Sequence, residues 1–197
     1  MSDPPAAAPE DAYVDPRAAA VLRRYEAAFG GGAGAGGWPG AAGGPGAAGA
    51  GLPIPVERIA EDLLGLEVRE SGTLGEASGM LVPRERRVWL AGDEPAPRKR
   101  FTLAHEIGHW VCQCREGRAQ VADVLCREVD LSTDRVTRVL EREANIFAAE
   151  LLMPRVAVRA VWEREQDVAA AAARFAVSDV AMGWRLYALG HVEYKPV

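Results

Sequence analysis

The sequence predicts an α+β protein, with a small β-sheet near the N-terminal end of the compact part packed on a mainly helical core. Three short runs of strand-forming residues follow one another at 66–70, 79–83 and 87–91, and turn-forming residues bound them. From about residue 98 onward, apolar residues recur at helical spacing between prolines and capping residues. A chain of 197 residues and 21.1 kDa is long enough for one domain of ordinary size with an extension.

We expect residues 1–51 to form a low-complexity or disordered N-terminal extension that contains one short helix. Residues 30–51 comprise 12 Gly, 7 Ala, 2 Pro and one Trp, so they offer almost nothing to bury and have high backbone entropy when free. Ahead of this tract, residues 16–29 have the pattern of a helix, with Asp15 as its N-cap and Pro16 at its first position. The domain that contains the candidate functional residues is therefore expected to span residues 52–197.

Local signals place the helices of that domain. A short amphipathic helix is expected before Gly65, which suits the position after a helix end. A cap among residues 132–134, Pro154 and Ser178 delimit helices in the second half, and the helical C-terminal part covers about 154–190. The expected helices are 55–64, 98–114, 134–153, 154–165, 168–175 and 179–189.

Composition excludes several classes of protein. The net charge of -5 and the pI near 5.3 provide no global positive field, so direct nucleic-acid contact is not expected. The longest uninterrupted apolar run, 168–173, is far shorter than the roughly 20 residues that span a bilayer. The N-terminus carries acids before its first cation, unlike a signal peptide, and three cysteines cannot all pair within one chain. We expect a cytoplasmic protein with no membrane partner.

The most informative segment is the helix that contains His105, Glu106 and His109. Two histidines four residues apart on a helix lie about 40° apart around the axis and ~6 Å along it, so both imidazoles can bind one ion. Glu106 can take a proton from a water that zinc has acidified. Gly108 removes a side chain beside the second histidine, which we expect to let a strand or substrate approach closely.

The third ligand of such an ion is expected on the helix at 134–153. Glu141 and Asn145 lie one turn apart and so share a face, which suits a carboxylate ligand with a supporting amide. Glu143 competes with Glu141, because it falls on the apolar stripe of the same helix, and periodicity alone does not choose between them. His191 and the thiols of Cys112, Cys114 and Cys126 are the weaker alternatives; idle thiols and a structural histidine are the simpler interpretation.

The sequence resembles the ImmA/IrrE family of metallo-endopeptidases in two motifs, residues 100–109 and 141–154, with support at 55–60 and 175–178. The resemblance covers roughly residues 52–189. It implies a zincin-like metallopeptidase core similar to that of thermolysin, a Zn²⁺ cofactor and Glu141 as the third zinc ligand. It also implies that the substrate is a helix-turn-helix DNA-binding repressor, and that its cleavage relieves the repression of phage, mobile-element or stress genes.

Other interpretations remain open from the sequence. The protein can be a regulatory binding protein of a repressor or toxin–antitoxin system that keeps the metal site without turnover. Residues 168–189 resemble a helix-turn-helix unit, but Arg174 and Arg185 are its only cations, which is few for phosphate contacts. A strand edge at 79–82 is a candidate for holding a substrate by strand addition.

Overall fold

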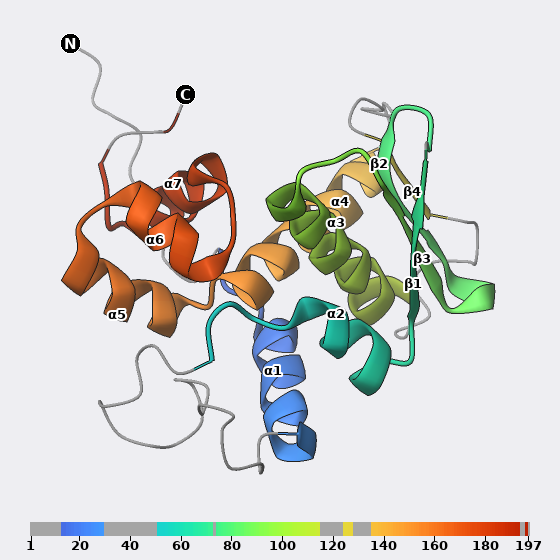
Figure 1. Cartoon of the computed structure of the whole chain (residues 1–197), viewed down its shortest axis with the longest axis horizontal. Coiled ribbons are helices and arrows are strands. Elements are labelled where there is room, and N and C mark those ends of the chain that lie inside the picture. Colours follow the sequence, from blue (N-terminus) through green and yellow to red (C-terminus); the bar gives the residue numbers. More distant parts are fainter. Residues whose placement is uncertain are drawn as a thin grey trace.

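The computed structural model describes residues 13–29, 51–72, 74–114, 124–127, 135–193 and 196. Within these residues the protein has a sheet on one side, a pair of long helices in the centre and a group of helices on the other side (Figure 1). The predicted α+β class is confirmed. No helix in the described part of the chain is long and apolar enough to cross a membrane.

The sheet contains four strands in the order β1-β3-β2-β4. β1 pairs in parallel with β3, whereas β2 pairs antiparallel with both β3 and β4. The three predicted strands are confirmed with shifts of one or two residues at their ends, and β4 is an additional strand. The strands are β1 Glu67–Ser71, β2 Ala77–Val82, β3 Arg87–Ala91 and β4 Val124–Arg127.

The pairing of β4 corrects the expected role of residues 79–82. These residues were expected to form an open strand edge, but β2 lies between β3 and β4, with Gly79 opposite Cys126 and Leu81 opposite Val124. Its backbone groups are therefore used within the sheet. A substrate cannot add to β2 while β4 is in place.

The helices agree closely with the expected ranges. The helix at the start of the domain and the metal-motif helix both end in a π-helical turn, Ile59–Leu63 and Trp110–Cys114. A short 3-10 helix, Pro83–Glu85, joins β2 to β3. The helices are α1 Pro16–Phe29, α2 Val56–Arg58, α3 Ala96–His109, α4 Arg135–Leu152, α5 Arg155–Glu165, α6 Val168–Phe175 and α7 Asp179–Ala188.

Side-chain caps fix several of these helix ends. The carboxylate of Asp15 accepts the backbone N–H of Arg17 at 2.8 Å, and Ser178 Oγ accepts the N–H of Ala181 at 3.1 Å, so both predicted caps are confirmed. Pro154 is the N-cap of α5 rather than its first residue. The cap expected among residues 132–134 lies outside the described residues.

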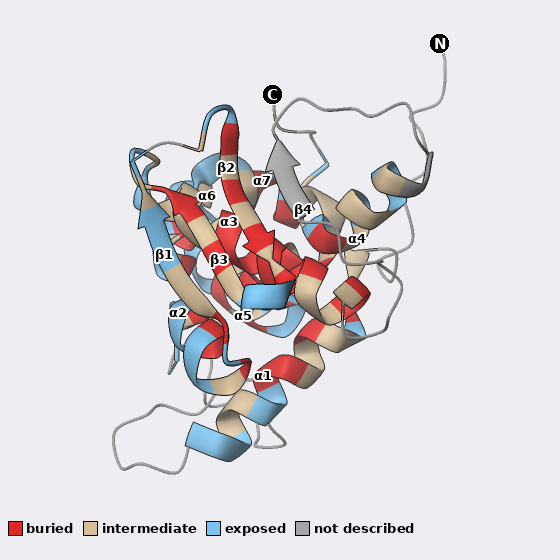
Figure 2. Cartoon of the chain, turned by 90° about the vertical axis from the view of Figure 1, so that its right-hand side faces the viewer, coloured by how far each residue is buried: buried red, intermediate tan, exposed pale blue. Residues whose placement is uncertain are grey.

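Helix α1 belongs to the hydrophobic core. Its buried face consists of Ala18, Val21 and Leu22, which join the core cluster, and α1 packs against α4 (Figure 2). The helix expected within an N-terminal extension therefore contributes to the compact domain, because its apolar face needs a partner to leave water. The rest of the extension, residues 1–12 and 30–50, lies outside the described residues.

The centre of the fold is the contact between α3 and α4. Their buried side chains include Leu103 and Ile107 from α3 and Phe147 and Leu151 from α4, none more than 1% exposed. The inner face of β2 and β3 lies against α3. This packing holds α3 between the sheet and α4, so every side chain of its metal motif faces protein: His105, Glu106 and His109 are all buried.

Candidate metal centre

The close approach of α3 and α4 depends on Gly108. A Cβ added at Gly108 would lie 3.0 Å from both Cα and O of Ala144 and 3.3 Å from Cδ1 of Phe147. The space that we expected to admit a strand or substrate is therefore filled by the backbone of α4. Glu141 precedes Ala144 by three residues. Because the two helices can touch at Ala144, the side chain of Glu141 lies close to the histidines.

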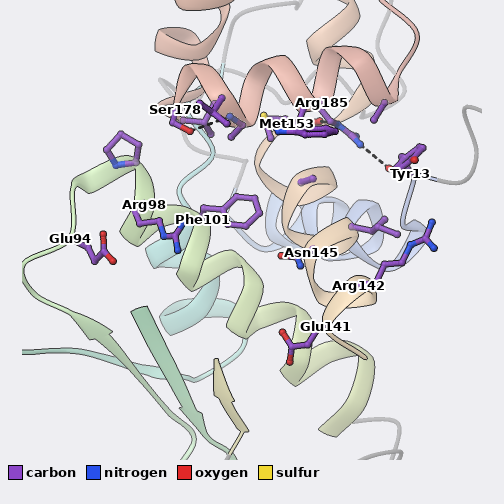
Figure 3. Close-up of a pocket in the computed structure, with 18 of the residues that line it drawn as sticks. Tyr13, Glu94, Arg98, Phe101, Glu141, Arg142, Asn145, Met153, Ser178 and Arg185 are labelled. Atoms are coloured by element: carbon purple, nitrogen blue, oxygen red, sulfur yellow. Dashed lines mark hydrogen bonds between the residues drawn. The ribbon is translucent and has the colours of Figure 1, made fainter. Parts of the chain in front are cut away.

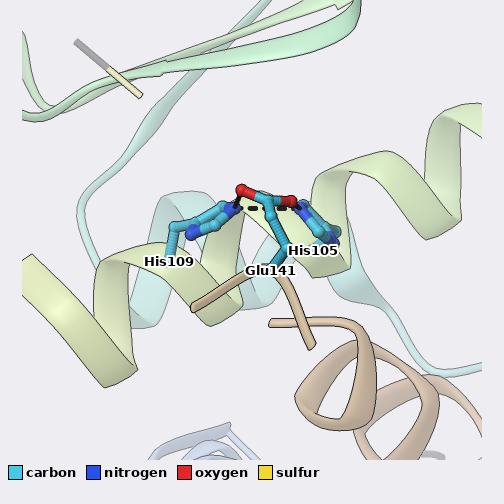
Figure 4. Close-up of side chains that lie close together, drawn as sticks. All are labelled: His105, His109 and Glu141. Atoms are coloured by element: carbon cyan, nitrogen blue, oxygen red, sulfur yellow. Dashed lines mark hydrogen bonds and ion pairs between the residues drawn. The ribbon is translucent and has the colours of Figure 1, made fainter. Parts of the chain in front are cut away.

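Three side chains from the two helices converge on one point (Figure 4). His105 Nε2 lies 3.3 Å from Glu141 Oε2, and His109 Nε2 lies 3.3 Å from Glu141 Oε1. The two Nε2 atoms are 2.9 Å apart. Among the described residues, these three form the group of donors suited to a metal ion, with all ligand atoms within 4.8 Å of one another.

Amide side chains orient both imidazoles. His105 Nδ1 lies 3.0 Å from Asn145 Oδ1, and His109 Nδ1 lies 2.8 Å from Gln113 Oε1. Gln113 is itself fixed, because its Nε2 donates to the carbonyl of Leu140 at 3.0 Å. An amide oxygen only accepts, so each Nδ1 carries a hydrogen; Nε2 then directs a lone pair toward Glu141 in the neutral imidazole and donates an N–H to it when the imidazole is protonated.

This arrangement fits a divalent cation. Two nitrogen lone pairs and a carboxylate that face one another repel unless a positive charge lies between them. Two histidines and one carboxylate are a donor set used by catalytic zinc, which keeps a fourth position open for water. The residues present therefore suit zinc, and the ordering of each imidazole by an amide is the support that metal-binding histidines receive.

The charged side chains of the site shift one another's pKa values. Burial raises the pKa of Glu141, but hydrogen bonds and charge from His105 and His109 outweigh that effect and lower the pKa to about 2. Burial lowers the pKa of His109, but Glu141 and Glu106 outweigh it, and the net shift is upward. Glu141 is therefore ionised at neutral pH, as a ligand carboxylate must be.

Glu106 lies beneath the sheet. Its side chain is fully buried, and a Cβ added at Gly79 of β2 would lie 3.3 Å from Glu106 Oε1 and 2.4 Å from Cγ2 of Thr102. Glycine at position 79 thus leaves room for the carboxylate between α3 and the sheet. The charge of Glu106 also contributes to the raised pKa of His109 and, after burial, to that of Cys114.

The structure does not bring the competing candidates to this point. Glu143 lies on another side of α4, toward Arg17 of α1; the hydrogen bond to Asp15 is the main reason that the pKa of Arg17 is raised, and the charge of Glu143 adds to it. His191 follows α7 and lies beside Arg155 and Arg159. Cys112 and Cys114 are thiols rather than disulfides and do not belong to the group of three. The side chain of Cys126 lies outside the described residues.

A cavity of about 1080 Å³ extends from the metal centre toward α7 (Figure 3). Glu141 and Asn145 lie at the end near the ion site, and the far wall is formed by α7. One side is formed by side chains from the first half of α3, and the other side by side chains from α4. Glu141 thus both lines the cavity and faces the two imidazoles.

Arg185 closes the inner side of that cavity and is not a phosphate contact. Its guanidinium is buried and pairs with Glu150, donates to the carbonyl of Met153 at 2.9 Å, and donates to the carbonyl of Tyr13 at 2.7 Å. One of the two cations of the helix-turn-helix interpretation is therefore committed to the interior. Sequence spacing offers no signal for this pair, because Glu150 and Arg185 are 35 residues apart.

The fold and the site together define a class: an α+β protein with an HExxH helix whose two histidines meet a glutamate from the next long helix. More specifically, the chain belongs to the family of IrrE N-terminal-like domains, Peptidase M78, whose model matches residues 62–187. The resemblance to the ImmA/IrrE family is thereby confirmed.

The chain is also similar to individual proteins. The chain is similar to the radiation response metalloprotease IrrE of Deinococcus radiodurans, with 31% identity over 133 residues, which is 63% of this chain and 36% of that protein. It also shares its fold with a Mycobacterium tuberculosis transcriptional regulator, with a TM-score of 0.58 and 20% identity over 89% of this chain and 48% of that one. The chain spans about a third of the length of the metalloprotease and half of the regulator.

Proposed function

We propose that this protein is a zinc-dependent endopeptidase in which His105, His109 and Glu141 hold the ion and Glu106 is the general base. The observation that carries the proposal is the convergence of two oriented imidazoles and one carboxylate beside a buried glutamate, at the end of a cavity. When bound, zinc would lower the pKa of a water molecule and would polarise the peptide carbonyl.

The chain's own residues supply the rest of the reaction. Asn145 and Gln113 keep each Nδ1 protonated and each Nε2 available, so the ligands need no rearrangement. A carboxylate oxygen of Glu106 accepts one proton from the attacking water and delivers it to the nitrogen of the departing amine. The C–N bond breaks, a C–O bond forms, and the products are a carboxylate and an amine.

The proposed substrate is a cytoplasmic DNA-binding repressor of the helix-turn-helix type. This part rests on the likeness to the ImmA/IrrE family, and the name of the Deinococcus relative, a radiation response metalloprotease, supports the peptidase activity. Cleavage of a repressor would link proteolysis to transcription without any contact between this chain and DNA.

The test is co-expression with a candidate helix-turn-helix repressor from the same organism, followed by mass spectrometry. Wild-type protein is expected to cut the repressor, whereas Glu106→Gln is expected to retain one zinc and lose cleavage by at least about 100-fold, because general-base catalysis contributes that much or more. Glu143→Gln is the matched control, since it removes a neighbouring carboxylate of α4 that points elsewhere, and it should cut normally. Equal cleavage by Glu106→Gln would remove Glu106 from the mechanism.

A further inference from the structure

The wall of the cavity formed by α7 is apolar and exposed. Val180 and Trp184 lie one turn apart on α7, so they share a face, and both line the cavity. Their exposed fractions are 56% and 41%, which places them among the few large apolar side chains that the described part of the chain leaves open to water. Covering them with a bound apolar side chain would be favourable.

Two further apolar side chains line the cavity from other helices. Phe101 comes from α3 and Ile146 from α4, and both are partly buried cavity residues. Ile146 directly follows Asn145, which supports His105, so the apolar part of the cavity begins next to the metal centre. An apolar side chain close to the reacting peptide bond would reach it.

The edge of the cavity beside Glu141 is positively charged. Arg138 and Arg142 are exposed residues one turn apart on α4, and both line the cavity. Like charges at this spacing repel each other, so an acidic group between them would stabilise both. The arrangement is local, because the net charge of the whole chain is -5.

The other end of the cavity is balanced in charge. Ser78 Oγ donates to Glu94 Oε1 at 3.1 Å, and Arg98 Nη2 donates to the same Ser78 Oγ at 3.4 Å. A glutamate and an arginine thus meet at one hydroxyl between β2 and α3. The electrostatic asymmetry of the cavity therefore runs from a neutral end at α3 to a cationic edge at α4.

We propose that this cavity selects an acidic-apolar segment of its protein substrate: a bulky apolar side chain against Phe101, Ile146 and Trp184, and an Asp or Glu beside Arg138 and Arg142. This inference rests on the proposed function and names the substrate class of the same site. An extended peptide advances about 3.3 Å per residue, and Arg142 directly follows Glu141. The acidic residue is therefore expected within about three positions of the cleaved bond.

Peptide binding to the zinc-loaded Glu106→Gln protein tests the charge selection without turnover. The probes are two fluorescein-labelled octapeptides with a central Phe-Leu pair, one flanked by Asp and Glu and the other by two Lys. The acidic probe is expected to bind roughly fivefold more tightly, the range of exposed ion pairs. Adding Arg138→Glu and Arg142→Glu should reverse the preference.

A matched control separates local from global charge. Arg23→Glu with Arg24→Glu makes the same change in net charge on exposed residues of α1, which do not line the cavity. This control should keep the preference for the acidic probe. Equal binding of the two probes by the parent protein, or the same reversal in the control, would overturn the charge selection.

The apolar wall is tested by Trp184→Ala in the same background. Affinity for the acidic Phe-Leu probe should fall roughly tenfold, the scale of a lost apolar contact in a pocket, whereas a probe with Ala-Ala in the centre should change little. Val156→Ala is the control, because Val156 is 54% exposed on α5 and does not line the cavity. Equal losses for both probes would contradict an apolar subsite at Trp184.

The peptidase activity and the substrate preference can fail separately. Repressor cleavage by the wild-type protein together with equal binding of the probes would overturn the inference and leave the proposed function intact. The predicted probe preference together with an uncut repressor and uncut probes would leave a selective binding cleft without the peptidase activity.

Discussion

Each imidazole of the metal centre depends on one amide oxygen behind it. Asn145 is exposed toward the cavity, so replacing it does not empty the core. Asn145→Ala removes the acceptor of the His105 Nδ1 hydrogen and is expected to weaken zinc binding by about 10- to 100-fold, as loss of such supporting groups does. Competition with a chromogenic chelator measures the change.

The control for this prediction is Asn145→Asp. This variant keeps an acceptor oxygen at the position of the amide oxygen, which lies 3.0 Å from His105 Nδ1. It should therefore keep most of the zinc affinity. The same loss in both variants would show that the amide oxygen does not orient His105.

The sequence predicted which three side chains would lie together. The spacing of His105 and His109 on one helix is a local property, and the structure places both imidazoles at one point. Choosing Glu141 over Glu143 required the family resemblance, because the rotation of α4 against α3 is set by tertiary packing. Gln113 was missed, although it lies one turn after His109 and the spacing rule applied to Asn145 would have indicated it.

Among the elements, the α3–α4 contact fixes the metal centre. Gly108→Ala would place a Cβ 3.0 Å from the α4 backbone at Ala144, which cannot move aside as a flexible side chain can. The helices must separate, and we expect a loss of about 1–3 kcal/mol in the free energy of unfolding together with weaker zinc binding. Urea denaturation and chelator competition on the same sample measure both effects.

Gly183→Ala is the matched control within a helix. A Cβ at Gly183 would meet only side-chain atoms of Pro196, at 3.1 Å, and Ala favours α7 over Gly by up to about 1 kcal/mol. This variant should bind zinc normally. Normal zinc binding by Gly108→Ala would contradict the account of the helix contact.

Local signals also explain which elements could be predicted. Helices α6 and α7 were predicted within one residue because their caps and apolar repeats lie within the segment itself. Strand β4 has only four residues, and its pairing with β2 bridges more than 40 positions of sequence. Such a partner is specified by the folded sheet, so the edge role expected for residues 79–82 was wrong.

In the whole molecule, the buried pair of Glu150 and Arg185 joins the centre to the C-terminal helices. Arg185 of α7 reaches Glu150 and Met153 at the end of α4 and Tyr13 near the N-terminus. Arg185→Met leaves the Glu150 charge buried without its partner, and we expect a loss of about 3–5 kcal/mol in the free energy of unfolding. Urea denaturation monitored by tryptophan fluorescence measures it.

An exposed ion pair on α5 serves as the control for this stability prediction. Arg159 and Glu163 are exposed and one turn apart on α5, so Arg159→Met should cost no more than about 0.5 kcal/mol. Similar small losses for both variants would show that the buried pair does not hold α7 against α4. The pair, like the packing of α1 on α4, joins residues distant in sequence, which is why composition and spacing did not predict either.

The most direct measurement is anomalous diffraction at the zinc edge on crystals of the zinc-loaded protein. We expect one strong peak about 2.0–2.2 Å from Nε2 of His105, Nε2 of His109 and a carboxylate oxygen of Glu141. A peak ligated by Glu143 or by the cysteines, or zinc bound with the Glu141 carboxylate turned away from it, would contradict the account.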